Sequence, residues 1–447
     1  MVELPMTTPL QAARHARGWS QVRAVSELIK AARLKNVTVA SAQSLKTELS
    51  RWENGHVTPT HYRKLLCDIY NSTPGDLGFG IQGLPDGVSP RIGADLISRQ
   101  RWGRDDLRKL SAAFDDAISR SAVSDIEVLA HEWLSVDKPQ LAELGIGRRI
   151  GDSAIATVEH RVMQLRRADD FISGRTSHAL VRQELQAATD LLNDAALTEE
   201  QACRLLSVTG ELAQLAAWVA ADAGLYRDAA KYAENGIVAA HAANNGPLAA
   251  NIISTFSYQV ANTASPRQAA MLARTAYAGV RRDATATTRA LLLERAAWAD
   301  AKSGDLASCE RALGLVEDNL CENKSGEEPD WVYWLNRQEV DVMAGRCYTE
   351  LNRPAKAEAL LRGALSGYDD AFIRENSLYL SWLSEDYILL GEIDAACEVA
   401  TQILELRSRA NSARTEERLR HLARLLRHYK TARSAAEFLD RYKSIAK

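Results

Sequence analysis

A short segment near the N-terminus carries polar side chains at the spacing of one helix face. Leu45, Leu49 and Trp52 recur at helical spacing within residues 44–52, so we expect them to face inward. The other side of this helix then presents four hydrogen-bonding side chains: Lys46, Thr47, Ser50 and Arg51. Lysine and arginine can donate to guanine O6 and N7, and threonine can offer its hydroxyl or contact a thymine methyl. The pattern favours a helix that reads base edges. For Arg51 the alternative is a surface salt bridge to one of two neighbouring carboxylates: Glu48 or Glu53.

The residues around this segment predict how the helix is held. Residues 52–55 read Trp-Glu-Asn-Gly, in which the indole can pack into a small core and Glu53 can bond back to an arginine or to free backbone N–H groups. Gly55 allows the positive φ that ends a helix. Upstream, residues 18–21 read Gly-Trp-Ser-Gln, and Ser20 can cap the start of a second helix.

With these motifs, residues 7–79, about one-sixth of the chain, resemble the helix-turn-helix DNA-binding domain of Xre-type, phage-repressor-like transcription regulators. The resemblance implies side chains that hold phosphates and position the protein without reading sequence: Gln21, Asn54, His56 and Thr58. One departure is the distance of 24 residues from Gln21 to Leu45, which exceeds the phage-repressor spacing. The extra segment, about residues 31–42, is similar to insertions in actinobacterial regulators. We expect it to lengthen the second helix and the following loop, with a small wing over the DNA backbone as one form of that loop.

The charge distribution agrees with this interpretation. Residues 1–78 hold ten Lys or Arg and six Asp or Glu, a net charge of +4. Since the whole chain has 55 against 58, residues 79–447 hold 45 against 52, a net charge of −7. A basic head on an acidic body is the electrostatic pattern of a DNA module carried by a larger domain that does not bind DNA.

Other classes of protein find no support in the composition. No run of eighteen apolar residues occurs, and residues 1–11 lack a basic stretch followed by an apolar one, so we expect neither membrane insertion nor secretion, and a cytoplasmic location. Phosphate-binding loops and the H-E-x-x-H and G-x-S-x-G motifs are absent, so we expect no enzyme activity, cofactor or metal. The six cysteines are scattered, and most of them lie on apolar helix faces, so we expect reduced thiols with a role in the core: Cys67, Cys203, Cys309, Cys321, Cys347 and Cys397.

The C-terminal part of the chain contains a repeat of helix, tight turn and helix. The turns are expected to begin at five residues, separated by 40, 40, 48 and 39 positions: Gly224, Ala264, Gly304, Asn352 and Gly391. Five positions beyond each turn the residue is small: Ala229, Ala269, Cys309, Ala357 and Ala396. Twelve positions beyond each turn lies a second set: Gly236, Ala276, Val316, Ala364 and Ile403. Small residues at the first offset let paired helices approach closely, which is similar to the tetratricopeptide (TPR) repeat.

The fold class that follows is all-α, with a small helix-turn-helix domain and a TPR-like stack of helical hairpins. We expect the DNA-binding domain over residues 1–79 and a linker over 80–103. A helical connecting region is expected over 104–200, and the TPR-like sensor and dimerisation domain over 201–447.

The TPR pattern predicts a groove lined by the first helix of each repeat. Its polar and aromatic side chains would suit an extended peptide. The lining positions implied by the pattern are these: Glu211, Gln214, Trp218, Asn251, Ser254, Tyr258, Glu294, Trp298, Glu339, Arg346, Ser381 and Glu385. The alternative for Trp218 and Trp298 is a place in the core.

The leading hypothesis is a DNA-binding transcription regulator of the actinobacterial build, distantly similar to the peptide-pheromone receptors of Gram-positive bacteria. We expect it to bind a double-stranded DNA operator as a homodimer and to respond to an effector, a short peptide or another small molecule. A second hypothesis is a protein-interaction scaffold whose head only localises it on DNA. A sensor of a non-peptide small molecule lies between the two.

Overall fold

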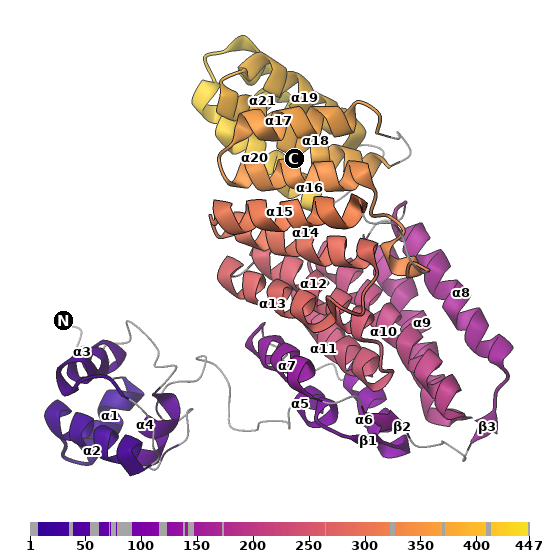
Figure 1. Cartoon of the computed structure of the whole chain (residues 1–447). Coiled ribbons are helices and arrows are strands. Elements are labelled where there is room, and N and C mark those ends of the chain that lie inside the picture. Colours follow the sequence, from indigo (N-terminus) through magenta and orange to yellow (C-terminus); the bar gives the residue numbers. More distant parts are fainter. Residues whose placement is uncertain are drawn as a thin grey trace. The chain divides into compact units, whose positions relative to one another are not determined.

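The computed structural model describes residues 8–34, 39–53, 62–70, 72, 77, 92–115, 123–136, 139–141, 147–171, 174–263, 265–321, 327–368, 372–407 and 413–445 (Figure 1). The chain divides into two compact units, residues 1–89 and 90–447. Both are built from helices, and the described strands are four pieces of two residues each. The all-α fold class is therefore confirmed.

The smaller unit contains four helices around one core. They are α1 (Pro9–Ala16), α2 (Gln21–Leu34), α3 (Ala42–Glu53) and α4 (Arg63–Tyr70). The core is formed by the apolar faces of these helices, with Leu28, Leu45 and Leu66 almost completely buried. The hydroxyl of Ser20 accepts a hydrogen bond from the Arg23 backbone N–H at 3.2 Å, so the predicted cap of α2 is confirmed.

Helix α3 contains the predicted helix 44–52 and begins two residues earlier, because the Ser41 hydroxyl accepts from the backbone N–H of Ser44 at 3.2 Å. Helix α2 continues to Leu34, so the predicted lengthening of the second helix is confirmed. Residues 35–38 of the insertion lie outside the described residues. No strand occurs in the described part of the smaller unit, and the loop in which a wing was expected falls partly on residues outside the described ones.

The larger unit opens with short elements and two longer helices. Their bounds are α5 Ile92–Ile97, β1 Arg101–Trp102, α6 Arg104–Asp115, α7 Val123–Ser135, β2 Gln140–Leu141, β3 Arg148–Arg149, α8 Asp152–Asp169, α9 Gly174–Asp194 and β4 Ala195–Ala196. Strands β1 and β2 pair in parallel, as do β3 and β4. Helix α5 and strand β1 fall within residues 80–103, the segment expected to be a linker. Leu96, Ile97 and Trp102 are buried in the core of the larger unit, so the last part of this segment belongs to the body.

The rest of the larger unit is a stack of helix pairs (Figure 1). The helices are α10 Glu199–Asp222, α11 Tyr226–Ala242, α12 Gly246–Thr263, α13 Pro266–Val280, α14 Ala286–Lys302, α15 Leu306–Cys321, α16 Arg337–Glu350, α17 Pro354–Leu365, α18 Ile373–Leu390, α19 Ile393–Arg407, α20 Ala413–Leu426 and α21 Arg433–Ile445. The 3₁₀ segments are η1 Asp330–Val332 and η2 Arg427–Tyr429. Each even-numbered helix from α10 packs on the helix that follows it, and the even-numbered helices also contact one another in series. They therefore form one continuous row on one side of the stack.

The turns inside the pairs follow the predicted repeat. Gly224, Gly304, Asn352 and Gly391 all have left-handed φ values, between 55° and 82°. Ala264, the remaining predicted turn residue, lies outside the described residues. The residues five positions beyond the turns are all completely buried: Ala229, Ala269, Cys309, Ala357 and Ala396. The prediction that small residues permit close helix pairing is confirmed.

A further small position, seven residues before each turn, completes the contact between paired helices. It is occupied by Ala217, Ser257, Ala297, Gly345 and Ser384. The hydroxyls of Ser257 and Ser384 donate to the carbonyl oxygens of Ala269 and Ala396, at 2.8 and 2.9 Å. A Cβ at Gly345 would lie 2.6 Å from Leu361 Cγ. Any larger side chain at this position would push the two helices apart.

Candidate functional site

The row of even-numbered helices encloses a cavity of about 390 Å³, which is within the range of small-molecule sites. Its walls come from α8, α10, α12, α14, α16, α18 and the segment around η1. Seven of the predicted groove residues line it: Gln214, Trp218, Asn251, Tyr258, Glu294, Glu339 and Arg346. These positions, which the repeat pattern predicted, lie on four different helices and meet at one cavity.

Ion pairs join the two ends of the row across the cavity. Arg374 of α18 lies 3.6 Å from Asp169 of α8 and 3.7 Å from Asp222 at the end of α10. Arg414 of α20 also donates to Asp222, at 2.5 Å. All except Arg414 are less than a tenth exposed as side chains. Removal of one partner would leave a buried charge uncompensated, so these contacts hold the row closed.

The connection between α15 and α16 covers a further side of the cavity. Its Asp330 accepts from Arg167 of α8 at 2.7 Å, and its Tyr333 donates to Asp170 at 2.7 Å. Trp331 and Trp334 of the same segment line the cavity. The predicted turns Gly304 and Asn352 are separated by 48 positions where the others are separated by 39 or 40. That irregularity is the sequence signal that could have revealed this covering segment.

The ring of Tyr258 lies at the centre of the site between two guanidinium groups. Arg346 donates to the Tyr258 hydroxyl at 2.7 Å, and its guanidinium lies 4.5 Å from the ring centre of Trp298. The Arg295 guanidinium lies 4.7 Å from the ring centre of Tyr258 and 5.4 Å from that of Trp334. Burial raises the pKa of Tyr258, but the charges of Arg346, Arg414 and Arg295 outweigh burial and lower it. The phenol is therefore held in a positive environment.

Two carboxyl groups of the site differ in how they are satisfied. Glu339 accepts hydrogen bonds from the hydroxyls of Tyr368 at 2.8 Å and Tyr379 at 2.6 Å. Glu294 is only 1% exposed, and neither of its carboxyl oxygens has a hydrogen-bond partner among the described residues. Burial, with the charge of Glu339, raises the pKa of Glu294 to about 7, although Arg295 and Arg346 oppose the shift. Such a group is costly to bury unless something binds it.

Three predicted groove residues do not line the cavity but lie behind its wall, so the prediction was wrong for them. Ser254 is completely buried and donates to the backbone carbonyl of Asn251. Trp298 is completely buried between the rings of Tyr258 and Trp382, so its core interpretation is right. Glu211 accepts from Arg166 at 3.2 Å and reaches the cavity only through that arginine.

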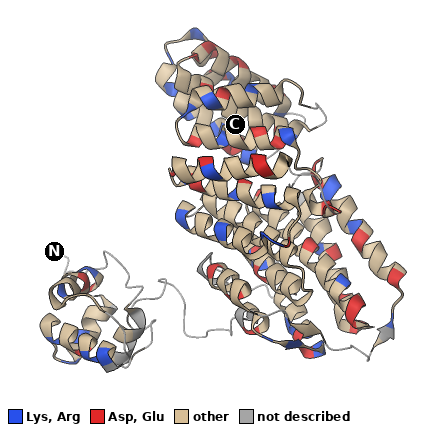
Figure 2. Cartoon of the chain, in the orientation of Figure 1, with Lys and Arg blue, Asp and Glu red and all other residues tan. Residues whose placement is uncertain are grey.

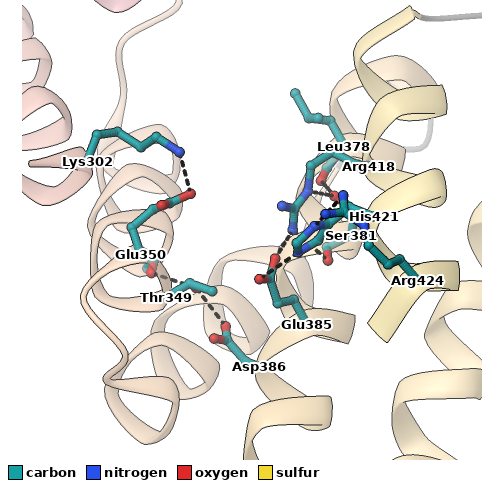
Figure 3. Close-up of polar contacts among 11 residues, drawn as sticks. Lys302, Thr349, Glu350, Leu378, Ser381, Glu385, Asp386, Arg418, His421 and Arg424 are labelled. Carbon is teal, nitrogen blue, oxygen red and sulfur yellow. Dashed lines mark hydrogen bonds and ion pairs between the residues drawn. The ribbon is translucent and has the colours of Figure 1, made fainter. Parts of the chain in front are cut away.

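The two remaining residues of the predicted list, Ser381 and Glu385, join α18 to α20 instead (Figure 3). Arg418 of α20 donates to the Ser381 hydroxyl at 3.0 Å and to Glu385 at 2.5 Å, and His421 lies 3.0 Å from Glu385. Burial raises the pKa of Glu385, but the hydrogen bond from His421 and the charge of Arg418 outweigh it and lower the pKa to about 2. Ser381 and Glu385 therefore serve to dock α20.

In the smaller unit, α3 presents the predicted polar face. Lys46, Thr47 and Arg51 are exposed and Ser50 is half-buried, whereas the apolar positions Leu45, Leu49 and Trp52 are buried. The predicted orientation of the helix is confirmed. Arg51 pairs with Glu48 at 3.0 Å, with both side chains more than a third exposed. The surface salt bridge is thus present, and an exposed pair of this kind is weak enough to exchange for another anion.

The end of α3 is fixed by Glu53, as its sequence position predicts. Glu53 is 2% exposed and accepts two hydrogen bonds from Arg14, at 2.6 and 2.9 Å. It also accepts from the side-chain amide of Gln21 at 2.9 Å. The amide expected to hold a phosphate thus has an internal partner in this structure. Asn54, His56 and Thr58, the other predicted phosphate contacts, lie outside the described residues.

Charges of both signs are interspersed along the helices of the larger unit (Figure 2). None of the described helices is long and apolar enough to cross a membrane. In the described part of the chain, no three His, Cys, Asp or Glu side chains gather as metal ligands, and five of the six cysteines are free thiols. No family model matches this sequence, and neither does any curated protein.

Proposed function

We propose that the chain is a DNA-binding transcription regulator of the Xre type, whose TPR-like body controls DNA binding by taking up a small effector. The observation that carries the proposal is the combination of two sites in separate units. One is the exposed basic face of α3, and the other is a partly enclosed cavity lined by Glu294, whose buried carboxyl has no hydrogen-bond partner among the described residues. A helix-turn-helix head supplies the DNA contact and the row of helices supplies the sensor. A cytoplasmic location follows from this role.

For the DNA-binding role of the smaller unit, support comes from the two different faces of α3. Leu45, Leu49 and Trp52 anchor one side in the core, and the buried Arg14–Glu53 pair fixes the end of the helix. Lys46, Thr47 and Arg51 are left exposed to meet a major groove. Readers of this type pair over two half-sites, so the proposal includes a homodimer.

For the sensor role of the larger unit, the volume of the cavity limits the size of the effector. A cavity of about 390 Å³, closed by Arg374, Arg414 and the segment around η1, favours a compact ligand. This supports a peptide of very few residues or a comparable small molecule over a long extended peptide. An effector must bind one arrangement of the body better than another, because equal binding to both shifts nothing.

The test of DNA binding is selection of operator sequences from a random DNA library by the full-length protein, followed by affinity measurements at fixed salt. Lys46→Ala and Arg51→Ala should each weaken binding to the selected sequence by about 1–3 kcal/mol and leave binding to scrambled DNA less affected. Lys30→Ala is the matched control, since Lys30 is an exposed cation on α2 that pairs with Glu27.

Failure to select any sequence would contradict the DNA-binding function. Equal losses on selected and scrambled DNA would remove Lys46 and Arg51 from the base-reading set. The effector half is tested by adding small-molecule extract of the host to the same assay, and an unchanged DNA affinity would favour the scaffold hypothesis.

A further inference from the structure

We propose that the effector is a small zwitterion with an aromatic ring, either a free aromatic amino acid or a dipeptide that contains one, held by Glu294 through its ammonium group and by Arg295 through its carboxylate. This inference rests on the proposed function in taking the cavity as the effector site. It goes further by naming the chemistry of the ligand and the two side chains that recognise it.

Glu294 is the first element of the argument. This residue lines the cavity and is almost completely buried, and both of its carboxyl oxygens lack a hydrogen-bond partner among the described residues. A second carboxyl of the same wall, that of Glu339, is satisfied by two tyrosine hydroxyls. A buried carboxylate without donors is unfavourable, and an ammonium group supplies both the charge and the hydrogen bonds that it lacks.

Arg295 is the second element. It is 7% exposed and lines the same cavity. Within the described residues its guanidinium has no ion-pair or hydrogen-bond partner and is held only over the rings of Tyr258 and Trp334. Guanidinium groups bind carboxylates through two parallel hydrogen bonds, so this group fits the other end of an amino acid.

The opposite charges of Glu294 and Arg295 attract each other, but the two side chains form no hydrogen bond with each other. Glu294 and Arg295 are consecutive on α14, both line the cavity, and no ion pair joins them. A purely cationic ligand would leave Arg295 uncompensated, and a purely anionic one would leave Glu294 uncompensated. A zwitterion supplies both an ammonium group for Glu294 and a carboxylate for Arg295.

Aromatic side chains supply the surface for the rest of the ligand. Trp218, Tyr258 and Trp334 line the same cavity, from α10, α12 and the segment before α16. Aromatic rings that stack or meet edge to face attract each other beyond the area they bury. The side-chain amide of Asn251 belongs to a residue of the same wall and can hydrogen-bond a peptide group of a dipeptide.

The probes are free phenylalanine, tyrosine and tryptophan, and dipeptides of glycine with each, titrated calorimetrically into the full chain. Two blocked forms of each ligand test the two ends: the N-acetyl form lacks the ammonium, and the C-terminal amide lacks the carboxylate. We expect saturable binding of at least one free zwitterion, and a loss of about tenfold or more for each blocked form, equal to about 1.4 kcal/mol.

Two variants assign the ends to side chains. In Glu294→Gln, acetylation of the ligand should no longer weaken binding, and in Arg295→Gln, amidation should no longer weaken it. The matched controls are Glu310→Gln and Arg311→Gln, a Glu–Arg pair that is consecutive on α15 and exposed. Glu294→Gln removes a buried carboxyl that has no hydrogen-bond partner among the described residues, so the fold should survive, and a melting curve checks this.

The proposal is overturned if no free zwitterion of the panel binds at millimolar concentration, or if the blocked forms bind as well as the free ones. If the panel fails while host extract still changes DNA affinity, only the ligand class is wrong. If a zwitterion binds the cavity but no DNA sequence can be selected, the ligand class stands and the regulatory function fails.

Discussion

Asp386 should make the stability of the body fall as the pH rises. This residue of α18 is completely buried, accepts one hydrogen bond from Thr349 at 3.1 Å, and has its other oxygen unpartnered among the described residues (Figure 3). Burial, together with the charge of the neighbouring Glu385, raises its pKa from 3.8 to about 8. The folded protein therefore holds a proton at this site near neutral pH, whereas the unfolded chain does not.

The direction and size of the effect follow from linkage. Below pH 4 Asp386 is protonated in both the folded and the unfolded state, so the protein has the full stability that this group provides. Between pH 4 and about pH 8 the unfolded chain releases the proton while the folded protein retains it. Each unit of pH in this window costs about 1.4 kcal/mol, so the unfolding free energy should fall by about 4 kcal/mol between pH 5 and pH 8 from this group alone. Asn at this position keeps an acceptor for Thr349 and removes the titration.

The assay is urea denaturation of wild type and Asp386→Asn at several pH values from 5 to 8. The difference in unfolding free energy, variant minus wild type, should grow steadily across this range. Asp318→Asn, on the exposed side of α15, is the control for loss of one acidic charge and should give a constant difference. A difference for Asp386→Asn that is the same at pH 5 and pH 8 would refute the assignment of a neutral buried acid.

Two further predictions concern the packing of each unit. Arg14→Leu should destabilise the smaller unit by about 3–5 kcal/mol, because the buried Glu53 carboxylate loses its ion-pair partner, and the double variant Arg14→Leu/Glu53→Leu should recover part of this loss. Denaturation curves test this, with Arg23→Leu as the control at an exposed arginine. A double variant as unstable as Arg14→Leu would contradict the prediction. Gly345→Val should lower the unfolding free energy by about 1–3 kcal/mol or more, since even a Cβ would lie 2.6 Å from Leu361. The melting curve of this variant is compared with that of Gly363→Val, a position with open space around it. Equal melting temperatures for the two variants would exclude a close contact at Gly345.

The local parts of the structure could be predicted from the sequence. The small residues beyond each turn, such as Ala229 and Ala396, are completely buried because two paired helices meet at that one position. The inward and outward faces of α3 follow from a spacing of three and four residues between Leu45, Leu49 and Trp52. These features depend on residues that lie within one or two helices of each other, so a single sequence contains the information.

The cavity could be predicted only in part. Asn251 and Tyr258 are seven residues apart, close to two helical turns, and both line it, but Ser254 lies off that face and packs into the wall. Arg374 and Arg414 were missed because they reach the cavity only when the row of helices curves back on itself. That curvature adds up from small rotations between successive helix pairs, and no short motif records it.

The ion pairs of Arg374 and Arg414 with Asp169 and Asp222 have a consequence for how the body unfolds. In an open array of helical pairs each unit touches only its neighbours, so stability is close to a sum of nearest-neighbour energies and the ends can fray independently. Here the first and last parts of the array are bonded directly across about 200 residues of sequence. Fraying at one end therefore removes contacts at the other, and the body should melt as one cooperative unit in which a truncated C-terminus weakens helices near residue 170.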